Sequence, residues 1–428
     1  MAVVSSGPDH GFLTRVTIAT AWGEGLDGYD LGGISVVLAL LIAPALHMSP
    51  IWVGLIGASS LIGIFFGAPI FGWFTDRFGR RLLFTIDLII FTAAGALQFF
   101  VQTDWQLFLV RIVLGLAIGA EYSIGAPMLA EFVPSAHRGN RLAALETCWY
   151  VGYLISVLAA FALISIPGVG WRLVLASAAV PAFICLLLRI GLPESPRWLM
   201  SQGREEEAHA IVARYLGGEA AFLAEDFAGE PAKRANFVGL FSGKYLLRTI
   251  YLCVFWSALV APYFAIFTFA PEVLRGLHLT SPALGQIVIN GVALIGVTIG
   301  MVVVDRIGRR RMATIPFWIS AIALAITGLW LGAPSWVIIT AFMVFSFFNA
   351  GQAVLCAIYP NELFPTDLRG SGAGVGSAAS RVGAAVGTFL LPIGIARFGV
   401  GPCMLIGAGV LVVGAVASHL LAPETAGL

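Results

Sequence analysis

Twelve apolar stretches, each long enough to cross a membrane, dominate this chain. An α-helix that crosses the hydrocarbon core of a bilayer needs about 20 mainly apolar residues, and such stretches follow one another between short polar breaks. We place them at residues 16–44, 51–75, 82–101, 106–131, 142–166, 171–191, 248–274, 283–304, 312–332, 335–357, 371–396 and 401–421. The sequence therefore predicts an all-α integral membrane protein with twelve transmembrane helices.

The composition excludes several other classes of protein. Only 11% of the residues are charged, against roughly 25% in soluble domains, so a soluble enzyme is not expected. A net charge of +1 creates no field that would attract nucleic acid. The five cysteines lie in apolar stretches without a CxxC pair or a His-rich neighbour, so we expect no disulfide, no metal site and no cofactor. The absence of a GxxxxGK[ST] loop argues against ATP-driven transport.

The basic residues predict the orientation of the helices. Lys and Arg gather in alternate loops, including the segments 77–81 and 306–311, while Arg172, Arg275 and Arg397 are the exceptions on the other side. Because cytoplasmic loops carry the excess of Lys and Arg, both termini are predicted to be cytoplasmic. The N-terminus lacks the features of a signal peptide, so the first span is expected to remain. We expect a multi-pass protein of the inner membrane, surrounded by lipid.

Three motifs of the first half recur in the second half. GWFTDRFGRR from Gly72 returns as GMVVVDRIGRR from Gly300, AEFVPSAHRG returns as NELFPTDLRG, and PESPR returns as PETAG. The pairs keep the same order and nearly the same separation, which indicates a duplication with parallel topology. We divide the chain into an N-terminal six-helix half (1–192), a cytoplasmic linker with a short amphipathic helix (193–247) and a C-terminal six-helix half (248–428).

These motifs resemble those of the major facilitator superfamily, over essentially the whole chain. The resemblance implies two pseudo-symmetric six-helix bundles that work by alternating access around one central site, in a monomer. Within the superfamily the chain resembles the branch that contains sugar porters, aromatic-acid:proton symporters and niacin-type transporters.

The motifs inside the helices distinguish these relatives. PESPR and the sequence GYDLG from Gly28 suit sugar porters, but helix seven lacks their glutamine-rich signature and helix ten lacks their GPxxW. The sequence DGYD from Asp27, together with Arg111 and Arg381, resembles the aromatic-acid:proton symporters. The resemblance therefore implies proton-coupled symport of a small organic anion, most simply an aromatic or heteroaromatic carboxylate. A sugar or polyol:proton symporter stays open as an alternative. Glu121 departs from the aromatic-acid branch and leaves room for another organic anion, or for an organic-cation carrier or exporter.

Ionisable residues inside the spans are the candidates for proton coupling. Each costs roughly 2.5–3.5 kcal/mol on insertion, so such residues are usually functional. Asp27 and Asp30 lie on one helical face, with Glu24 a turn earlier, and Glu121 lies near the middle of helix four. We predict that Asp27 or Asp30 carries the proton, and that Glu121 is a second proton site or the partner of Arg111 or Arg381. An ion pair or helix cap is the alternative for the two aspartates.

Arg381 is the predicted anchor of an anionic substrate. A guanidinium keeps its charge and binds a carboxylate through two hydrogen bonds, although a permanent salt bridge is also open. Arg111 is a second candidate, closer to the outer end of helix four, where its side chain can snorkel to the headgroups. Other side chains at similar depth are predicted to line the cavity, although each could equally serve helix packing: Tyr150, Trp256, Tyr263, Asn349 and Gln352.

The loop motifs predict a conformational gate. In the resembled superfamily such residues form cytoplasmic charge networks that keep the outward-open state closed on the inside, which sets a two-state equilibrium. A topology signal alone would not require the acids or the glycines. The predicted gate residues are Asp76, Arg77, Gly79, Arg80, Arg81, Glu131 and Arg138 in the first half, and Asp305, Arg306, Gly308, Arg309, Glu362 and Arg369 in the second. Asp87 is expected to be a structural partner of the first basic loop.

Overall fold

The computed structural model describes residues 9–133, 135–216, 237–243, 245–277, 282–364 and 366–425. Within these residues, 12 helices are long and apolar enough to cross a membrane, which confirms the predicted all-α membrane fold. The first six spans are α1 (His10–Val37) with the π-helix η1 (Leu38–Ile42) and α2 (Ala43–Ala45), α3 (Pro50–Phe78), α4 (Arg80–Leu97) with η2 (Gln98–Phe100), α5 (Asp104–Phe132), α6 (Ser135–Ile164), and α7 (Trp171–Ala176) with α8 (Ala179–Arg189).

The other six spans form the C-terminal half. They are α13 (Tyr245–Thr268) with α14 (Ala270–Gly276), α15 (Pro282–Ile307), α16 (Arg309–Leu329), α17 (Ser335–Ala353) with α18 (Leu355–Leu363), α19 (Thr366–Phe398) and α20 (Val400–Leu421). Between the halves lie α9 (Pro196–Ser201), α10 (Glu205–Tyr215) and α12 (Phe237–Leu240), and α10 falls where the short amphipathic helix is predicted.

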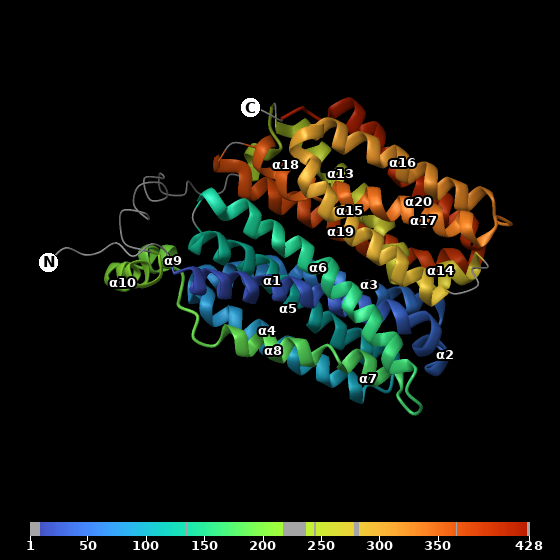
Figure 1. Ribbon diagram of the computed structural model, residues 1–428, viewed down its shortest axis with the longest axis horizontal. Coiled ribbons are helices and arrows are strands. Elements are labelled where there is room, and N and C mark those ends of the chain that lie inside the picture. The colour runs from blue at the N-terminus through green and yellow to red at the C-terminus, as the bar shows by residue number, and fades with distance from the viewer. Residues whose placement is uncertain are drawn as a thin grey trace.

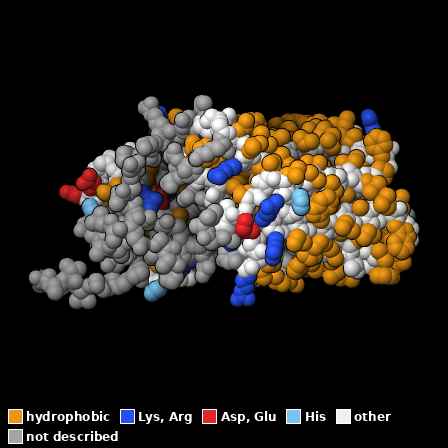
Figure 2. All heavy atoms as spheres, turned by 90° about the horizontal axis from the view of Figure 1, so that it is seen from above, with side chains coloured by type: hydrophobic (Ala, Val, Ile, Leu, Met, Phe, Trp, Pro, Cys, Tyr) orange, Lys and Arg blue, Asp and Glu red, His pale blue; other side chains and the backbone are white. Residues whose placement is uncertain are grey.

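The two groups of six helices lie side by side, the first below and the second above in Figure 1. α9 and α10 lie at one end of the bundle, which we call the inner end, while α2, α7 and α14 mark the opposite, outer end. Figure 2 shows apolar side chains over most of the described surface away from the inner end. Such a surface suits lipid, where helices satisfy their own backbone hydrogen bonds.

Glycines let neighbouring helices approach closely. A Cβ added to Gly63 of α3 would lie 2.4 Å from the carbonyl oxygen of Ile112 of α5, and one added to Gly28 of α1 would lie 2.0 Å from that of Trp149 of α6. In the second half, a Cβ on Gly300 of α15 would lie 2.4 Å from the carbonyl oxygen of Gly351 of α17. Small residues at these crossings therefore provide the contact area that holds helices together in lipid.

Helix seven, predicted as one span, is broken near its outer end. α13 ends at Thr268 and α14 begins at Ala270, with Pro271 in the first turn of α14. Proline is tolerated there because its missing N–H would have no partner inside the helix. Helix one also becomes irregular near its outer end, at η1, and α14 packs against η1.

The two halves meet at the outer end of the bundle. The hydroxyl of Tyr153 donates to the carbonyl oxygen of Phe267 at 3.0 Å, and Gln286 Nε2 donates to Ser35 Oγ at 2.7 Å. Near the outer ends of α3 and α19, a Cβ on Gly54 would lie 2.3 Å from the carbonyl oxygen of Phe389. These contacts hold the two halves together at the outer end.

Candidate substrate and proton site

Side chains from both halves meet around Asp27 in α1. The hydroxyl of Tyr122 in α5 donates to Asp27 Oδ2 at 2.6 Å, and Trp149 Nε1 in α6 donates to the same oxygen at 2.7 Å. From the other half, the guanidinium of Arg381 in α19 lies 4.8 Å from the centre of the Tyr122 ring. The predicted proton carrier and the predicted anion anchor are thus brought to one place.

Asp27 and Arg381 attract each other without forming a direct ion pair in the described structure. Their charges interact favourably, and Tyr122 lies against both of them. Within the described residues, Asp27 Oδ1 and Arg381 Nε are buried and have no hydrogen-bond partner. Because buried polar atoms are normally satisfied, these two atoms are available to a proton and to a ligand.

Aromatic side chains surround this pair. The ring of Trp149 lies 5.0 Å from that of Tyr150 and 6.3 Å from that of Tyr263, which stacks on Phe267 at 4.0 Å. Trp256 packs against α19, and its Nε1, like the hydroxyl of Tyr263, is buried without a hydrogen-bond partner in the described part of the chain. Tyr150 and Tyr263 thus lie beside Trp149, which binds Asp27, and a role of Tyr150, Trp256 or Tyr263 towards the substrate stays a prediction.

The two predicted amide residues bond the backbone of neighbouring helices. Asn349 Nδ2 donates to the carbonyl oxygen of Leu259 at 3.2 Å, and Gln352 Nε2 donates to that of Ala313 at 2.8 Å. These contacts join α17 to α13 and to α16, which is the packing role named as the alternative. A role for either amide towards the substrate stays a prediction.

Asp30 and Arg111 form a buried bidentate pair. Arg111 Nη1 lies 3.1 Å from Asp30 Oδ1 and Nη2 lies 2.9 Å from Oδ2, while Nη2 also donates to Ser60 Oγ at 2.9 Å. The Arg111 side chain has an exposed fraction of 0%, so the expectation that it snorkels is wrong. A carboxylate at the same depth offers two charge-assisted hydrogen bonds, and the guanidinium of Arg111 is occupied by Asp30 rather than free for a substrate.

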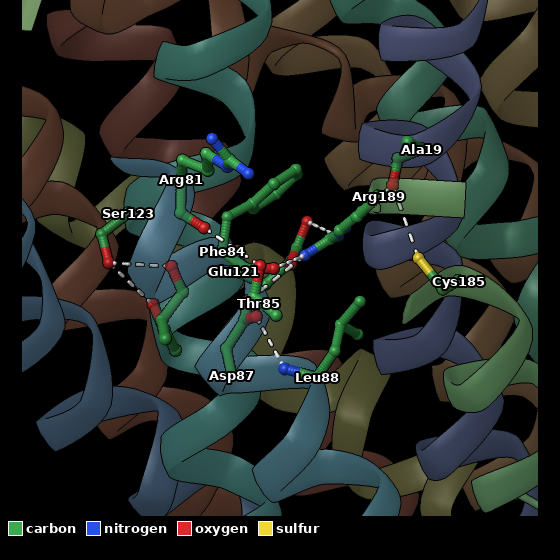
Figure 3. Close-up of polar contacts among 12 residues, drawn as sticks. Ala19, Arg81, Phe84, Thr85, Asp87, Leu88, Glu121, Ser123, Cys185 and Arg189 are labelled. Atoms are coloured by element: carbon green, nitrogen blue, oxygen red, sulfur yellow. Dashed lines mark hydrogen bonds and ion pairs between the residues drawn. The ribbon is translucent and has the colours of Figure 1, made fainter. Parts of the chain in front are cut away.

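A second buried cluster joins Glu121 to Arg189, not to Arg111 or Arg381 (Figure 3). Arg189 Nη2 lies 2.7 Å from Glu121 Oε1 and Nη1 lies 3.5 Å from Asp87 Oδ2. Asp87 therefore points to Arg189 and not to the basic loop as expected. We missed Arg189 because it ends the sixth span and looks like a residue of the positive-inside pattern, although the apolar run around it was a signal.

Glu146 of α6 was also missed. Its charge interacts with those of Arg381 and Asp27, which places a further carboxyl group beside the central site. The signal was its position, one helical turn before Tyr150 in the fifth span.

Four residues form a network at the inner end of the first half. Arg80 Nη2 lies 2.7 Å from Glu131 Oε1, and the hydroxyl of Ser195 donates to the other oxygen of Glu131. Glu194 Oε1 accepts a hydrogen bond from the backbone N–H of Arg80 at 2.9 Å. Gly79 has φ +96°, and a Cβ at this position would lie 2.5 Å from Glu194 Oε2. Both the backbone conformation and the close contact therefore require glycine.

The second half repeats this network. Arg309 Nη2 lies 3.1 Å from Glu362 Oε1, and the hydroxyl of Thr425 donates to Glu362. Glu424 Oε1 accepts from the backbone N–H of Arg309 at 2.8 Å, and Gly308 has φ +90°. Glu194 of PESPR and Glu424 of PETAG are therefore part of these networks at the inner end. The list of predicted gate residues did not include them.

The remaining gate residues have weaker contacts or are not described. The guanidinium of Arg77 lies 5.7 Å from the ring centre of Trp73, and the carbonyl oxygen of Asp76 accepts from Trp198 Nε1 at 3.0 Å. Arg81 contributes its backbone N–H to Glu194, and Arg306 is exposed at the end of α15. The side chains of Arg138, Asp305 and Arg369 lie outside the described part of the structure, so their roles stay predictions.

The comparison with known families decides the class of this transporter. The family described as "Sugar (and other) transporter" matches residues 16–428. The chain belongs to this family. The inner membrane metabolite transport protein YgcS of Escherichia coli (strain K12) is 38% identical over 421 residues, which cover 98% of this chain and 94% of the relative. The niacin transporter NiaP of Acinetobacter baylyi is 28% identical, over 83% of this chain and 81% of its own.

Solved structures agree on the fold. A partially occluded inward-open conformation of the xylose transporter XylE from E. coli superposes with a TM-score of 0.82 at 22% identity, over 98% of this chain and 99% of that one. The major facilitator fold and the multi-pass membrane character are thereby confirmed. The narrower assignment to the aromatic-acid branch gains no support, and the family match favours the sugar-type alternative.

Proposed function

We propose that this protein carries a small sugar-type metabolite together with a proton across the inner membrane. Transport occurs by alternating access between the two halves of a single chain. The inner end and both termini face the cytoplasm. The observation that carries the proposal is Asp27: it is buried, one of its oxygens has no partner, and it faces Arg381 across the interface between the halves.

Protonation of Asp27 changes the force between the halves. An ionised Asp27 attracts the guanidinium of Arg381, whereas a protonated Asp27 does not, so the proton biases the equilibrium between the two states of a rocking bundle. If one proton moves with each neutral substrate, a difference of one pH unit supplies about 1.4 kcal/mol, which corresponds to roughly tenfold accumulation.

Unsatisfied polar atoms near the central site support a sugar. Trp256 Nε1, the hydroxyl of Tyr263, Arg381 Nε and Asp27 Oδ1 are buried without a partner in the described structure. Each can bond a hydroxyl group, and a sugar presents several. Helices seven and ten lack the sugar-porter signatures, and these buried atoms of aromatic and charged residues partly offset that lack.

An aromatic or heteroaromatic carboxylate remains the second candidate. It is favoured by one observation, the stacking of Arg381 on Tyr122 at 4.8 Å with Nε left free, because a guanidinium binds a carboxylate tightly. The relative that is named a niacin transporter is 28% identical to this chain, and niacin is a heteroaromatic carboxylate.

Uptake into proteoliposomes tests the proposal. Labelled D-xylose, D-glucose, nicotinate and benzoate are offered with the outside more acidic than the inside, to wild type and to Asp27→Asn. We expect uptake of a sugar that rises with the pH gradient and loses this dependence in Asp27→Asn. Sugar uptake that ignores the gradient contradicts proton coupling, and uptake of an acid instead of a sugar selects the second candidate.

A further inference from the structure

Five buried carboxyl groups form a continuous line through the N-terminal half. Asp30, Asp27 and Glu24 follow one face of α1, Glu121 lies on α5, and Asp87 lies on α4. Each side chain is at most 7% exposed. Neighbours along the line repel one another electrostatically: Asp30 with Asp27, Asp27 with Glu24, Glu24 with Glu121, and Glu121 with Asp87.

Glu24, the middle member of this line, has no arginine or lysine paired with it in the described structure. Within the described residues its carboxyl group makes no hydrogen bond and no ion pair. The titratable groups that face it among the described residues are Glu121, Asp27, Glu146, Arg381, Tyr122 and Cys148. Three of these are acids, and the arginine is the weakest influence on Glu24 among the charged ones. An ionised carboxylate without a partner is very costly inside a membrane protein, so Glu24 is stable in this position when it holds a proton.

Asp87 and Glu121 share a single base. Arg189 lies 2.7 Å from Glu121 and 3.5 Å from Asp87, and the negative charges of the two carboxyl groups repel each other. Two carboxyl groups can bond each other only if one of them carries a proton, and one guanidinium balances only one of two negative charges. The other titratable group against the cluster is Cys185 of α8. The geometry of the pair therefore fits one shared proton.

A small cavity lies beside Asp87 and Glu121, where α1 passes at the residue before Glu24. A Cβ on Gly23 would lie 2.0 Å from Glu121 Oε1 and 2.3 Å from Arg189 Nη2, so α1 passes directly beside the pair at the residue before Glu24. Residues of α1, α4 and α5, among them Gly23, Asp87 and Glu121, line a cavity of about 10 Å³. This volume suits about one water molecule, and a water in contact with carboxyl groups can relay a proton.

We propose that Glu24, Glu121 and Asp87 form a proton-release path that leads from Asp27 to the inner end and away from the substrate site. This inference rests on the proposed proton coupling, since the proton that leaves is the one carried by Asp27. The path begins where Glu24 faces Arg381 at the interface between the halves, and it continues into the N-terminal half among α1, α4, α5 and α8.

The proton moves by successive replacement. The shared proton of Asp87 and Glu121 leaves to water at the inner end, about two helical turns from the start of α4 at Arg80. The proton of Glu24 then moves to the pair, and the proton of Asp27 moves to Glu24. One proton has left, every other acid has regained its own, and Asp27 is the group that ends ionised and facing Arg381.

Two transport modes separate this path from the substrate site. Equilibrium exchange of labelled substrate at equal pH requires no net proton release, whereas accumulation driven by a pH gradient does. The probe is labelled D-xylose, or nicotinate where the uptake experiment above selects the acid. Glu24→Gln and Asp87→Asn each keep size and hydrogen bonding but cannot pass a proton, and Asp104→Asn, at the outer end of α5, is the matched control.

We expect both path variants to exchange within about twofold of wild type and to lose accumulation, which is roughly tenfold for one pH unit in wild type. The control should accumulate as wild type does. Wild-type accumulation in both path variants, or loss of exchange together with accumulation, would overturn the path, the second outcome because it marks a structural role.

Infrared spectroscopy of purified protein adds a readout that needs no substrate. In wild type at neutral pH, part of the carbonyl band of protonated carboxyl groups should disappear in Glu24→Gln and another part in Asp87→Asn. An unchanged band would overturn the inference. If the wild type does not accumulate substrate in response to the pH gradient, both the symport and its release path are refuted. If the wild type and both path variants accumulate substrate, only the path is refuted.

Discussion

Glu194 Oε1 accepts a hydrogen bond from the backbone N–H of Arg80 at 2.9 Å, so the acid that follows the sixth span caps the helix of the third. The first N–H groups of a helix have no partner within it and carry partial positive charge, which makes a carboxylate a favourable cap. Glu424 caps Arg309 in the same way at 2.8 Å. The repeated PES and PET motifs are therefore tertiary caps that tie the end of each half to its middle.

Loss of the first cap should destabilise the protein measurably. Glu194→Gln removes the charge and at least one of the hydrogen bonds to the start of α4. We expect a cost of about 1 kcal/mol, as for other helix caps, which lowers Tm by roughly 1 °C in a chain of this length. Thermal unfolding in detergent measures this, with Glu206→Gln in the exposed first turn of α10 as the control. Equal Tm values for the two variants would show that the cap contributes nothing.

The glycine of each loop motif should tolerate no side chain. Gly79→Ala places a side chain on a backbone with φ +96° and ψ 158°, which costs about 1–3 kcal/mol for a residue other than glycine, and it adds a Cβ that would lie 2.5 Å from Glu194 Oε2. Gly399→Ala is the matched control, because its φ is +82° and nothing lies within 4 Å of the added Cβ. We expect Gly79→Ala to lower Tm and exchange rate more than Gly399→Ala. Similar losses in both variants would assign the effect to backbone strain alone.

The Asp30–Arg111 pair should show strong energetic coupling. Removal of one partner leaves a buried charge uncompensated, which typically costs 3–5 kcal/mol, so Asp30→Asn and Arg111→Gln should each be poorly stable. The double variant Asp30→Asn/Arg111→Gln has no unpaired charge, and we expect it to recover part of the loss. Tm values of the four proteins form a double-mutant cycle. Losses that simply add would mean that the two side chains do not act as a pair.

The positions of the spans could be predicted because bilayer thickness sets their length. The duplication could be predicted because each repeated motif is contiguous in sequence. The pairing of charged side chains could not, since it depends on how each helix is rotated against its neighbours. Arg111 was expected near the headgroups, yet Asp30 binds it at full burial. Arg189 was read as a topology signal, yet it reaches inward to Glu121 and Asp87. The irregular end of helix seven was visible only as Pro271.

The preference for an aromatic acid also came from too few residues. It rested on the missing signatures in helices seven and ten and on two arginines, one of which the structure assigns to Asp30. The family match over residues 16–428 averages over the whole chain and favours the sugar-type group. Substrate preference depends on a handful of atoms around Asp27 and Arg381, and that is the part of the site that local motifs constrain least.

Substitution of Arg381 should distinguish the two candidate substrates. A carboxylate bound by the guanidinium loses a charge-assisted hydrogen bond in Arg381→Gln, worth about 1.5–3 kcal/mol, so KM for an acid should rise by roughly 10- to 150-fold. A sugar loses only a neutral contact of about 0.5–1.5 kcal/mol, so its KM should rise by no more than about tenfold. The measurement is the concentration dependence of exchange at equal pH, with Arg397→Gln, at the outer end of α19, as the control.

Arg381→Gln, compared with Arg381→Lys, also tests the link between Arg381 and Asp27. If the attraction between the two charges moves the halves, Arg381→Gln should weaken the response to a pH gradient even when exchange is saturated with substrate. Arg381→Lys keeps the charge but not the planar guanidinium that stacks on Tyr122, and we expect it to retain more of this response than Arg381→Gln. A full pH response in Arg381→Gln would show that Asp27 acts without Arg381, and the driving charge would then have to be sought at another base.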